Sequence, residues 1–187
     1  MNETIRIAII YGSARQGRFC DKVVEWAAAE VAAHGGFTMD RIDPAVDLPA
    51  SPDRGREPSL WQRIDQADAY LVVTPEYNHG YPAPLKSLID SVGSEWHAKP
   101  VAFVSYGGVS GGLRAVEQLR QVFAELHTVT VRETVAFAAA WEQFDESGRL
   151  LHPERHKRAM TALLSRLHWW ATALREARQA TPFARAA

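Results

Sequence analysis

The chain has 187 residues, of which 47% are hydrophobic and 23% charged, a composition typical of one ordinary globular domain. Its formal net charge of −1 argues against a general nucleic-acid binder, and weakly against an electron carrier that docks by acidic charge alone. Cys20 is the only cysteine, so neither an internal disulfide nor a cysteine metal site can form. The apolar run over residues 7–11 is too short for a signal-peptide core or a membrane span, so we expect a cytoplasmic protein with no membrane association.

Short apolar runs alternate with helical patterns, and there is no internal repeat or interdomain linker. We therefore expect a single domain over residues 1–187, with a frayed tail over 178–187. Strands are predicted over residues 5–11, 37–42, 69–74, 100–106 and 128–138. Helices are predicted over residues 21–33, 60–66, 84–92 and 113–127, and a long final helix is predicted to bury Met160, Leu163, Leu164, Leu167, Trp170, Ala171 and Leu174.

This alternation predicts a doubly wound, three-layer α/β domain with a five-stranded parallel sheet. Residues 43–58 hold four prolines and many charges, and are predicted to form a surface loop. In such sheets ligands bind outside the carboxyl ends of the strands, where the strand order reverses. The loops after the first, third and fourth strands are therefore the candidate functional segments.

The first of these loops, residues 12–19, has the features of an anion cradle. Its glycines allow a tight turn with exposed N–H groups, and the following helix N-terminus adds a partial positive charge. Ser13 can donate a hydroxyl hydrogen bond, while Arg15 and Arg18 supply two guanidinium groups, which suits a terminal phosphate monoester. The alternative is an ordinary strand-to-helix turn with solvated arginines.

Two other phosphate-binding loops do not fit the same residues. A P-loop needs Gly-Lys-Ser/Thr, and here Gly17 is followed by Arg18 and Phe19. The G-x-G-x-x-G dinucleotide fingerprint is absent, so we discount Asp40 and Asp43 as acids that would bind a ribose.

The second loop, residues 74–84, carries three prolines, a glycine, two tyrosines, an asparagine and His79. A stiff backbone with an amide and stackable rings can line a flat heteroaromatic ligand. A lone loop histidine is more often a bystander than an acid–base catalyst. Lys86 and Asp90 are four residues apart on the next helix and are expected to form a weak surface pair.

The third loop, residues 105–112, holds four glycines directly before a predicted helix. Its backbone can approach a planar ligand edge and direct several N–H groups at it. Such donors would stabilise negative charge that develops on the ligand. The alternative is a flexible turn.

Three motifs together resemble the NADPH-dependent FMN reductase family, whose members include flavin, quinone, azo-dye and chromate reductases on a flavodoxin-like fold. They are GSARQGR at residues 12–18, PEYN at 75–78 followed by LKSLID at 85–90, and SYGGVSGG at 105–112. The resemblance runs from Ile5 to about Leu174. Each motif alone has modest specificity, but three motifs in order at three strand ends form a specific pattern.

The resemblance implies a cofactor site for FMN. The phosphate would be held by Ser13, Arg15, Gly17, Arg18 and Phe19. The isoalloxazine and ribityl chain would be lined by Pro75, Glu76, Tyr77 and Asn78. The other side of the ring would be closed by Ser105, Gly107, Gly108 and Gly111. Members of the family usually form dimers with the flavin near the interface, so the resemblance implies a homodimer or a higher homo-oligomer. Three aromatic residues could either line such a surface or pack in the core: Trp96, Trp141 and Phe144.

The implied activity is an NAD(P)H-dependent oxidoreductase in which hydride passes from NADPH or NADH through the flavin N5 to a second acceptor. A quinone, free flavin, azo compound or metal oxyanion could be this small-molecule acceptor. No side chain need act as acid, base or nucleophile, so we assign no catalytic residue. The alternatives are a non-enzymatic flavodoxin-type electron carrier and a flavin-based redox sensor. We expect no metal, because His152 and His156 share one helix face without a third ligand and are expected to be solvated.

Overall fold

A computed structural model describes residues 4–48 and 58–183. In this part of the chain, parallel strands form one sheet in the order β2-β1-β3-β4-β5. The strands are β1 (Ile5–Tyr11), β2 (Phe37–Ile42), β3 (Ala69–Pro75), β4 (Pro100–Gly107) and β5 (Val129–Ala138). The helices are α1 (Cys20–His34), α2 (Pro44–Asp47), α3 (Leu60–Gln66), α4 (Ala83–Asp90), α5 (Leu113–Glu125) and α6 (Glu154–Ala180), with two short 3-10 helices, η1 (Ser94–Trp96) and η2 (Ala140–Glu142).

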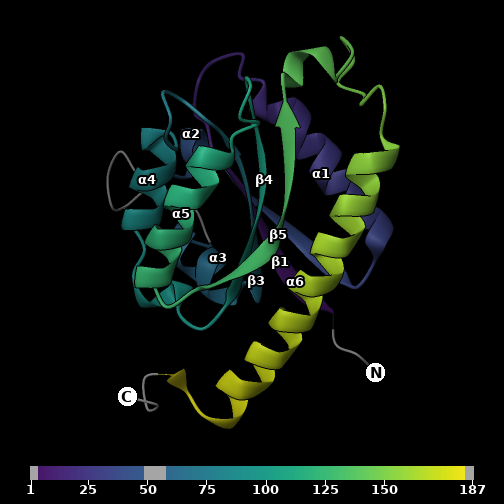
Figure 1. Ribbon diagram of the computed structural model, residues 1–187. Coiled ribbons are helices and arrows are strands. Elements are labelled where there is room, and N and C mark those ends of the chain that lie inside the picture. The colour runs from purple at the N-terminus through teal and green to yellow at the C-terminus, as the bar shows by residue number, and fades with distance from the viewer. Residues whose placement is uncertain (1–3, 49–57, 184–187) are drawn as a thin grey trace.

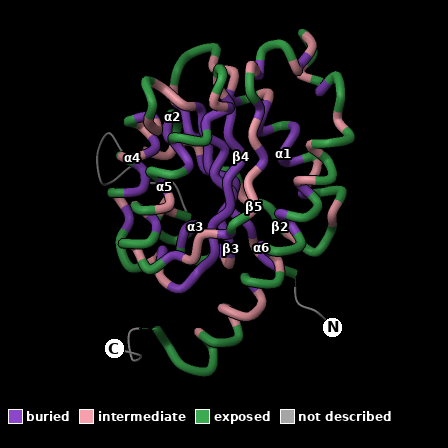
Figure 2. Tube along the Cα trace, in the orientation of Figure 1, coloured by how far each residue is buried: buried purple, intermediate pink, exposed green. Residues whose placement is uncertain are grey.

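The sheet is the middle of three layers. Helices α1 and α6 cover one of its faces, and α3, α4 and α5 cover the other (Figure 1). Every residue of β3 is buried, as are all but one in each of β1 and β4, and Figure 2 shows this buried centre. Burial on both faces explains the continuous apolar runs of these strands. The predicted doubly wound α/β fold is confirmed.

The strand order reverses between β1 and β3, since the chain leaves β1 toward β2 and returns to the other side of β1. At this point Gly12 follows β1, and its N–H donates to the carbonyl of Val73 at 2.7 Å. A Cβ on Gly12 would lie 2.6 Å from the Cα of Thr74. Only glycine allows this approach, which brings the first loop against the end of β3.

Two predicted segments differ from the structure. The expected loop over residues 43–58 begins with the short helix α2, because Asp43 caps it by accepting from the Ala45 N–H and Pro44 suits its first turn; residues 49–57 of that loop lie outside the described residues. Helix α6 continues through Arg178 to Ala180, and the Arg178 guanidinium donates to the Ala98 carbonyl at 2.6 Å.

The apolar stripe of α6 is buried only in part. Met160, Leu163, Leu164, Leu167 and Ala171 are buried as predicted, whereas Trp170 is 36% exposed and Leu174 is half-buried. The last turns of α6 extend past the sheet and are largely exposed (Figures 1 and 2). The apolar residues at helical spacing therefore continue beyond the part of α6 that the sheet covers.

Candidate functional site

The first and second loops meet through side chains at the carboxyl ends of β1 and β3. The Oγ of Ser13, which is fully buried, lies 3.0 Å from the hydroxyl of Tyr77. The guanidinium carbon of Arg15 lies 3.7 Å from the centre of the Tyr77 ring, a cation–π contact. Arg15 is otherwise exposed, so its charge faces solvent at the rim of this contact.

The first loop presents backbone donors together with the start of α1. Among the described residues, the N–H groups of Gln16, Gly17 and Arg18 have no hydrogen-bond acceptor. Gly17 has φ +63° and open space around it, while Phe19 precedes α1 without giving it a side-chain cap. Unpaired N–H groups beside an uncapped helix N-terminus fit a phosphate.

Arg18 does not present a free guanidinium to this cradle. Its Nη1 donates to Asp43 Oδ1 at 2.7 Å and its Nε donates to Asp21 Oδ1 at 2.7 Å. It also bonds the second carboxylate oxygen of Asp43 and the carbonyl of Ser13. The hydrogen bond with Asp43 raises the pKa of Arg18, and only 10% of its side chain is exposed. Arg18 therefore holds the first loop against the start of α2.

The phenyl ring of Phe19 belongs to the packing beneath the cradle. Its centre lies 5.8 Å from that of Tyr106 and 5.6 Å from that of Phe144. Any contact from Phe19 to a phosphate would come from its backbone.

The second loop contains a tight turn. Tyr77 and Gly80 exchange backbone hydrogen bonds of 2.9 and 3.1 Å, and both central residues, Asn78 and His79, have positive φ. Asparagine tolerates this conformation better than most residues. The amide of Gln118 on α5 donates to the His79 carbonyl at 2.9 Å, so α5 fixes the turn. Lys86 and Asp90 form the predicted pair at 2.6 Å on α4.

Glu76 joins the second loop to the third. Its carboxylate accepts from the Ser110 hydroxyl at 2.7 Å, from the Arg114 N–H at 3.1 Å, and from the Arg114 guanidinium. Only 4% of the Glu76 side chain is exposed. Burial raises the pKa of this carboxyl, but the hydrogen bonds from Arg114 and Ser110 outweigh burial and bring the pKa below its usual value. Glu76 therefore stays ionised and holds the loops together.

The third loop closes on itself and leaves donors free. The hydroxyl of Ser105, fully buried, donates to the Gly111 carbonyl at 2.8 Å. A Cβ on Gly112, which has φ +85°, would lie 2.8 Å from the Ser105 Cβ and 2.9 Å from Tyr106 backbone atoms. Within the described part of the chain, the N–H groups of residues 108–110 have no acceptor. This is a second run of donors, on the far side of Glu76 from the first.

Two buried groups lie under the loops. Burial raises the pKa of the Cys20 thiol and of the Tyr106 hydroxyl. The Cys20 thiol donates to the Val73 carbonyl at 3.5 Å. Both groups stay protonated at neutral pH, so neither supplies a thiolate or phenolate nucleophile.

The structure therefore brings all three predicted loops to one edge of the sheet. Arg15, Tyr77 and the free N–H groups lie at that edge. The side chains of Arg18 and Ser105 instead bond other residues of the chain and so stabilise the loops. The sequence interpretation missed the partners that fix these loops, since no local pattern pairs residues so far apart in the chain: Asp43, Arg114 and Gln118.

The three aromatics considered for a subunit surface separate into two groups. Trp96 is fully buried, 4.7 Å from Tyr70 and 5.6 Å from Phe123 between ring centres, and Phe144 is also buried. These two are core residues. Trp141 is 61% exposed.

The histidines lie apart from one another or pack against other side chains in the described part of the chain. Among residues 4–48 and 58–183, no group of three or more His, Cys, Asp or Glu side chains is placed to hold a metal ion. His156, expected to be solvated, is half-buried instead and stacks on Phe137 with ring centres 4.3 Å apart. The correction follows from tertiary packing, because α6 lies against β5.

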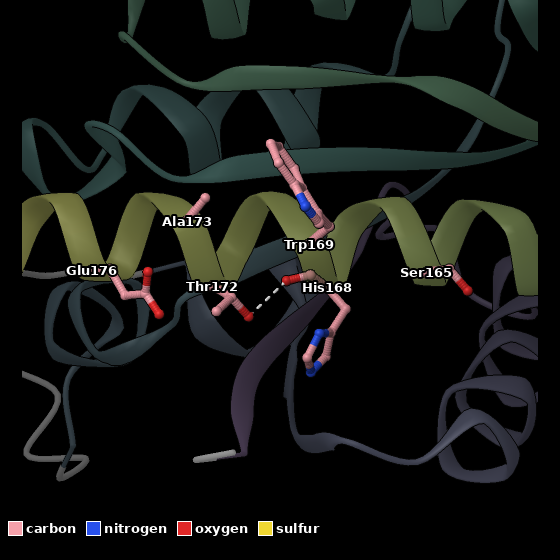
Figure 3. A pocket seen from close by; sticks show the side chains of 6 residues that line it. All are labelled: Ser165, His168, Trp169, Thr172, Ala173 and Glu176. Atoms are coloured by element: carbon pink, nitrogen blue, oxygen red, sulfur yellow. Dashed lines mark hydrogen bonds between the residues drawn. The ribbon is translucent and has the colours of Figure 1, made fainter. Parts of the chain in front are cut away.

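A surface hollow lies on α6, away from the three loops. The six labelled side chains come from that helix alone and project to different sides of it (Figure 3). Its lining joins no loop at the strand ends, so it is separate from the three-loop site.

The geometry fits a flavin mononucleotide: unpaired donors and Arg15 for the phosphate, and glycine-rich backbone with a second run of donors for the ring. The family model of the NADPH-dependent FMN reductases matches residues 5–142. An NAD(P)H-dependent FMN reductase of Saccharomyces cerevisiae is 52% identical over 148 residues, 63% of this chain and 73% of that protein. A probable NADPH:quinone oxidoreductase of Oryza sativa is 35% identical over 180 residues, 86% of this chain and 89% of that protein.

A solved structure has the same fold: the flavoenzyme NAD(P)H:(acceptor) oxidoreductase FerB of Paracoccus denitrificans, with a TM-score of 0.70 and 24% identity over 90% of this chain and 97% of that one. The chain belongs to the NADPH-dependent FMN reductase family, as the sequence motifs predicted. It is an FMN-dependent oxidoreductase that takes its electrons from NAD(P)H.

Proposed function

We propose that the protein transfers hydride from NAD(P)H to a small-molecule acceptor, with a quinone as the favoured class, through FMN held by the three loops. The observation that carries this proposal is their convergence, with one run of free N–H groups at residues 16–18 and another at 108–110. The first run suits a phosphate and the second suits a polar ring edge.

In this proposal the exposed guanidinium of Arg15 binds the phosphate, whereas the guanidinium of Arg18 is already paired with carboxylates of the chain. Arg15 lies over the Tyr77 ring, from which its guanidinium can reach a phosphate bound at Ser13. The phosphate replaces the missing side-chain cap at the start of α1, and Ser13 and the N–H groups of Gly17 and Phe19 contribute hydrogen bonds. Arg18 acts as a positioning residue that holds this loop through Asp43.

The ring in this proposal lies between the second and third loops. On one side it is lined by backbone and side chains of Pro75, Glu76, Tyr77 and Asn78. On the other side it is closed by the segment that contains Ser105, Gly107, Gly108 and Gly111. The Glu76 bonds to Ser110 and Arg114 fix the spacing between the two sides. A pair of loops that is held together in this way avoids reordering when the ring binds.

When bound, FMN would supply the two-electron chemistry, so that NAD(P)H, one proton from solvent and a quinone give NAD(P)⁺ and a hydroquinone. The chain's own contribution is to bind and orient. The free N–H groups of residues 108–110 stabilise negative charge that develops at the ring edge. Glu76, Cys20 and Tyr106 are each held in one protonation state at neutral pH, so we assign no side chain as a catalytic acid, base or nucleophile.

A quinone is the favoured acceptor because relatives over most of this chain's length carry the names NADPH:quinone oxidoreductase and quinone reductase. Examples come from Oryza sativa and Pseudomonas putida. Free flavin, azo compounds and metal oxyanions are the alternative acceptors to be tested beside a quinone. We place the protein in the cytoplasm; among the described residues, no helix has the length and apolar character needed to cross a bilayer.

We further propose that the protein acts as a homodimer. Helix α6 exposes Trp169 and Trp170, which are 60% and 36% exposed and form a T-shaped pair with ring centres 5.0 Å apart. Two large aromatic side chains on one exposed helix are typical of a protein interface. Light scattering should give twice the mass of the chain, and a Trp169→Lys variant should shift it toward the monomer.

The central experiment is to purify the protein, identify its flavin, and mix it anaerobically with NADH or NADPH. The expected result is loss of oxidised-flavin absorbance within seconds with at least one donor, and its return on adding a quinone. Oxidised flavin that persists with both donors would overturn the proposal. Reduction only by a partner protein would instead indicate an electron carrier.

A further inference from the structure

Trp141 is an exposed aromatic residue at the same edge of the sheet as the three loops. It lies in η2, directly after β5, with 61% of its surface exposed. If Gly108 had a Cβ, that atom would lie 3.8 Å from Cη2 at the outer edge of the Trp141 indole. The indole therefore leans over the third loop at the position where the loop has no side chain.

The backbone around Trp141 is fixed to that loop. The N–H of Ala139 donates to the Gly108 carbonyl at 3.0 Å, and Ala139 has φ +45°. A positive φ is unfavourable for alanine, and such strained positions cluster at functional sites. Gln143 adds a hydrogen bond from its amide to the Ala138 carbonyl. These contacts hold η2, and hence Trp141, against the Gly-rich loop.

The other exposed tryptophans have partners that Trp141 lacks. Trp61 donates its indole N–H to the Ser91 carbonyl at 2.6 Å, and Trp169 pairs with Trp170. Within the described part of the chain, the side chain of Trp141 has no ring contact and no hydrogen bond. A large exposed ring on a backbone that is held beside the donors at residues 108–110 is suited to stacking on a ligand.

We propose that Trp141 forms one wall of the subsite for the planar, electron-poor ring of the second substrate, the electron acceptor. This inference rests on the proposed function, because it places that ring beside the loop assigned to the flavin. The electron-rich face of an indole favours electron-poor planar rings. A quinone ring has this chemistry, whereas the dihydronicotinamide ring of NADPH is electron-rich, and Trp141 acts on the binding of the acceptor without taking part in hydride transfer.

The experiment compares Trp141→Ala and Trp141→Phe with Trp61→Ala, a control that removes an exposed tryptophan from α3. The constants measured on the FMN-loaded enzyme are KM and kcat for 1,4-naphthoquinone, KM for NADPH, and KM and kcat for ferricyanide, which has no planar ring. The Kd of 1,4-naphthoquinone for the oxidised enzyme is measured by calorimetry without a reductant. The Kd of FMN and the molecular mass serve as checks.

In Trp141→Ala we expect about a tenfold rise in the KM and Kd of 1,4-naphthoquinone, with kcat for ferricyanide and the Kd of FMN unchanged. Trp141→Phe should recover most of the loss, and Trp61→Ala should match wild type. A selective rise in the KM for NADPH would place the dihydronicotinamide ring there instead and would overturn the inference. Equal constants in wild type and Trp141→Ala would overturn the inference, as would a change in mass, which would assign Trp141 to a subunit interface. If wild type itself oxidises no NAD(P)H, the proposed function fails first.

Discussion

The two ends of the sheet use charged residues in opposite ways. At the amino ends of the strands, Asp68 accepts from the Arg6 N–H at 3.1 Å and from Arg175 and Arg178 at 3.3 Å each. The Lys99 ammonium there donates to the carbonyls of Ile64 and Asp65 at 2.9 and 2.7 Å. At the carboxyl ends, Arg15 and two runs of N–H groups keep their capacity to bond.

This difference separates stability from binding. Donors that are satisfied within the chain cannot also bind a ligand without first breaking a bond. The ion pairs of Asp68 at the amino edge therefore contribute to folding, and the free donors at the carboxyl edge contribute to cofactor affinity. Arg18 is the exception, since it lies at the carboxyl edge but is paired like a residue of the amino edge.

The largest expected effect is at Gly112. In Gly112→Ala the added Cβ would lie 2.8 Å from the Ser105 Cβ and 2.9 Å from backbone atoms of Tyr106, and the φ of residue 112 is +85°. Strain and overpacking together should lower the free energy of unfolding by about 3 kcal/mol and weaken FMN binding more than about tenfold. Denaturant titration measures the first and flavin fluorescence the second. Gly108→Ala is the matched control, because its Cβ would meet nothing closer than 3.8 Å and its stability should stay near wild type.

Next in size is the loss of charge at the amino edge. Asp68→Asn leaves two partly buried guanidinium groups without their carboxylate, and should lower the free energy of unfolding by about 2 kcal/mol. FMN affinity should not change. Asp90→Asn breaks the exposed pair with Lys86 and should cost less than about 0.5 kcal/mol. Equal losses in the two variants would contradict the assignment of Asp68 to stability.

A third pair of variants compares the two arginines of the first loop. Arg15→Gln should weaken FMN binding about tenfold, with little effect on riboflavin, which lacks the phosphate, or on stability. Arg18→Gln should instead lower stability, because it leaves Asp43 without its paired cation. Flavin titrations at low and high salt, with denaturant curves for both variants, distinguish the two roles. The reverse result would assign Arg18 to the phosphate.

The smallest expected effect is a pH dependence from Lys99. Burial lowers its pKa from 10.5 to about 8 in the folded protein. Between these values the unfolded chain binds more protons than the folded one, so the free energy of unfolding rises with pH. From about pH 7.5 to about pH 8.5 this contribution is about 0.7 kcal/mol. Lys99→Met should lose that rise relative to wild type, as measured by denaturant titration at each pH; parallel curves would show that Lys99 does not titrate there.

The sequence by itself determined the layered α/β fold, because burial on both faces gives continuous apolar runs, and helices that cover a sheet show a helical period. It also placed the three loops, because glycine is needed where backbones approach closely, as at Gly12 and Gly112. Both signals are local, so they can be read along the chain.

Only the tertiary structure decided which charges are free. Arg15 and Arg18 look equivalent in the sequence, but Asp43 lies 25 residues beyond Arg18 and reaches it only after β2 has paired with β1. In the same way, Glu76 meets Arg114 across 38 residues, and His156 is half-buried because α6 docks on β5. The physical reason is that pairing and burial depend on distances in space, which the spacing of residues along the chain does not determine.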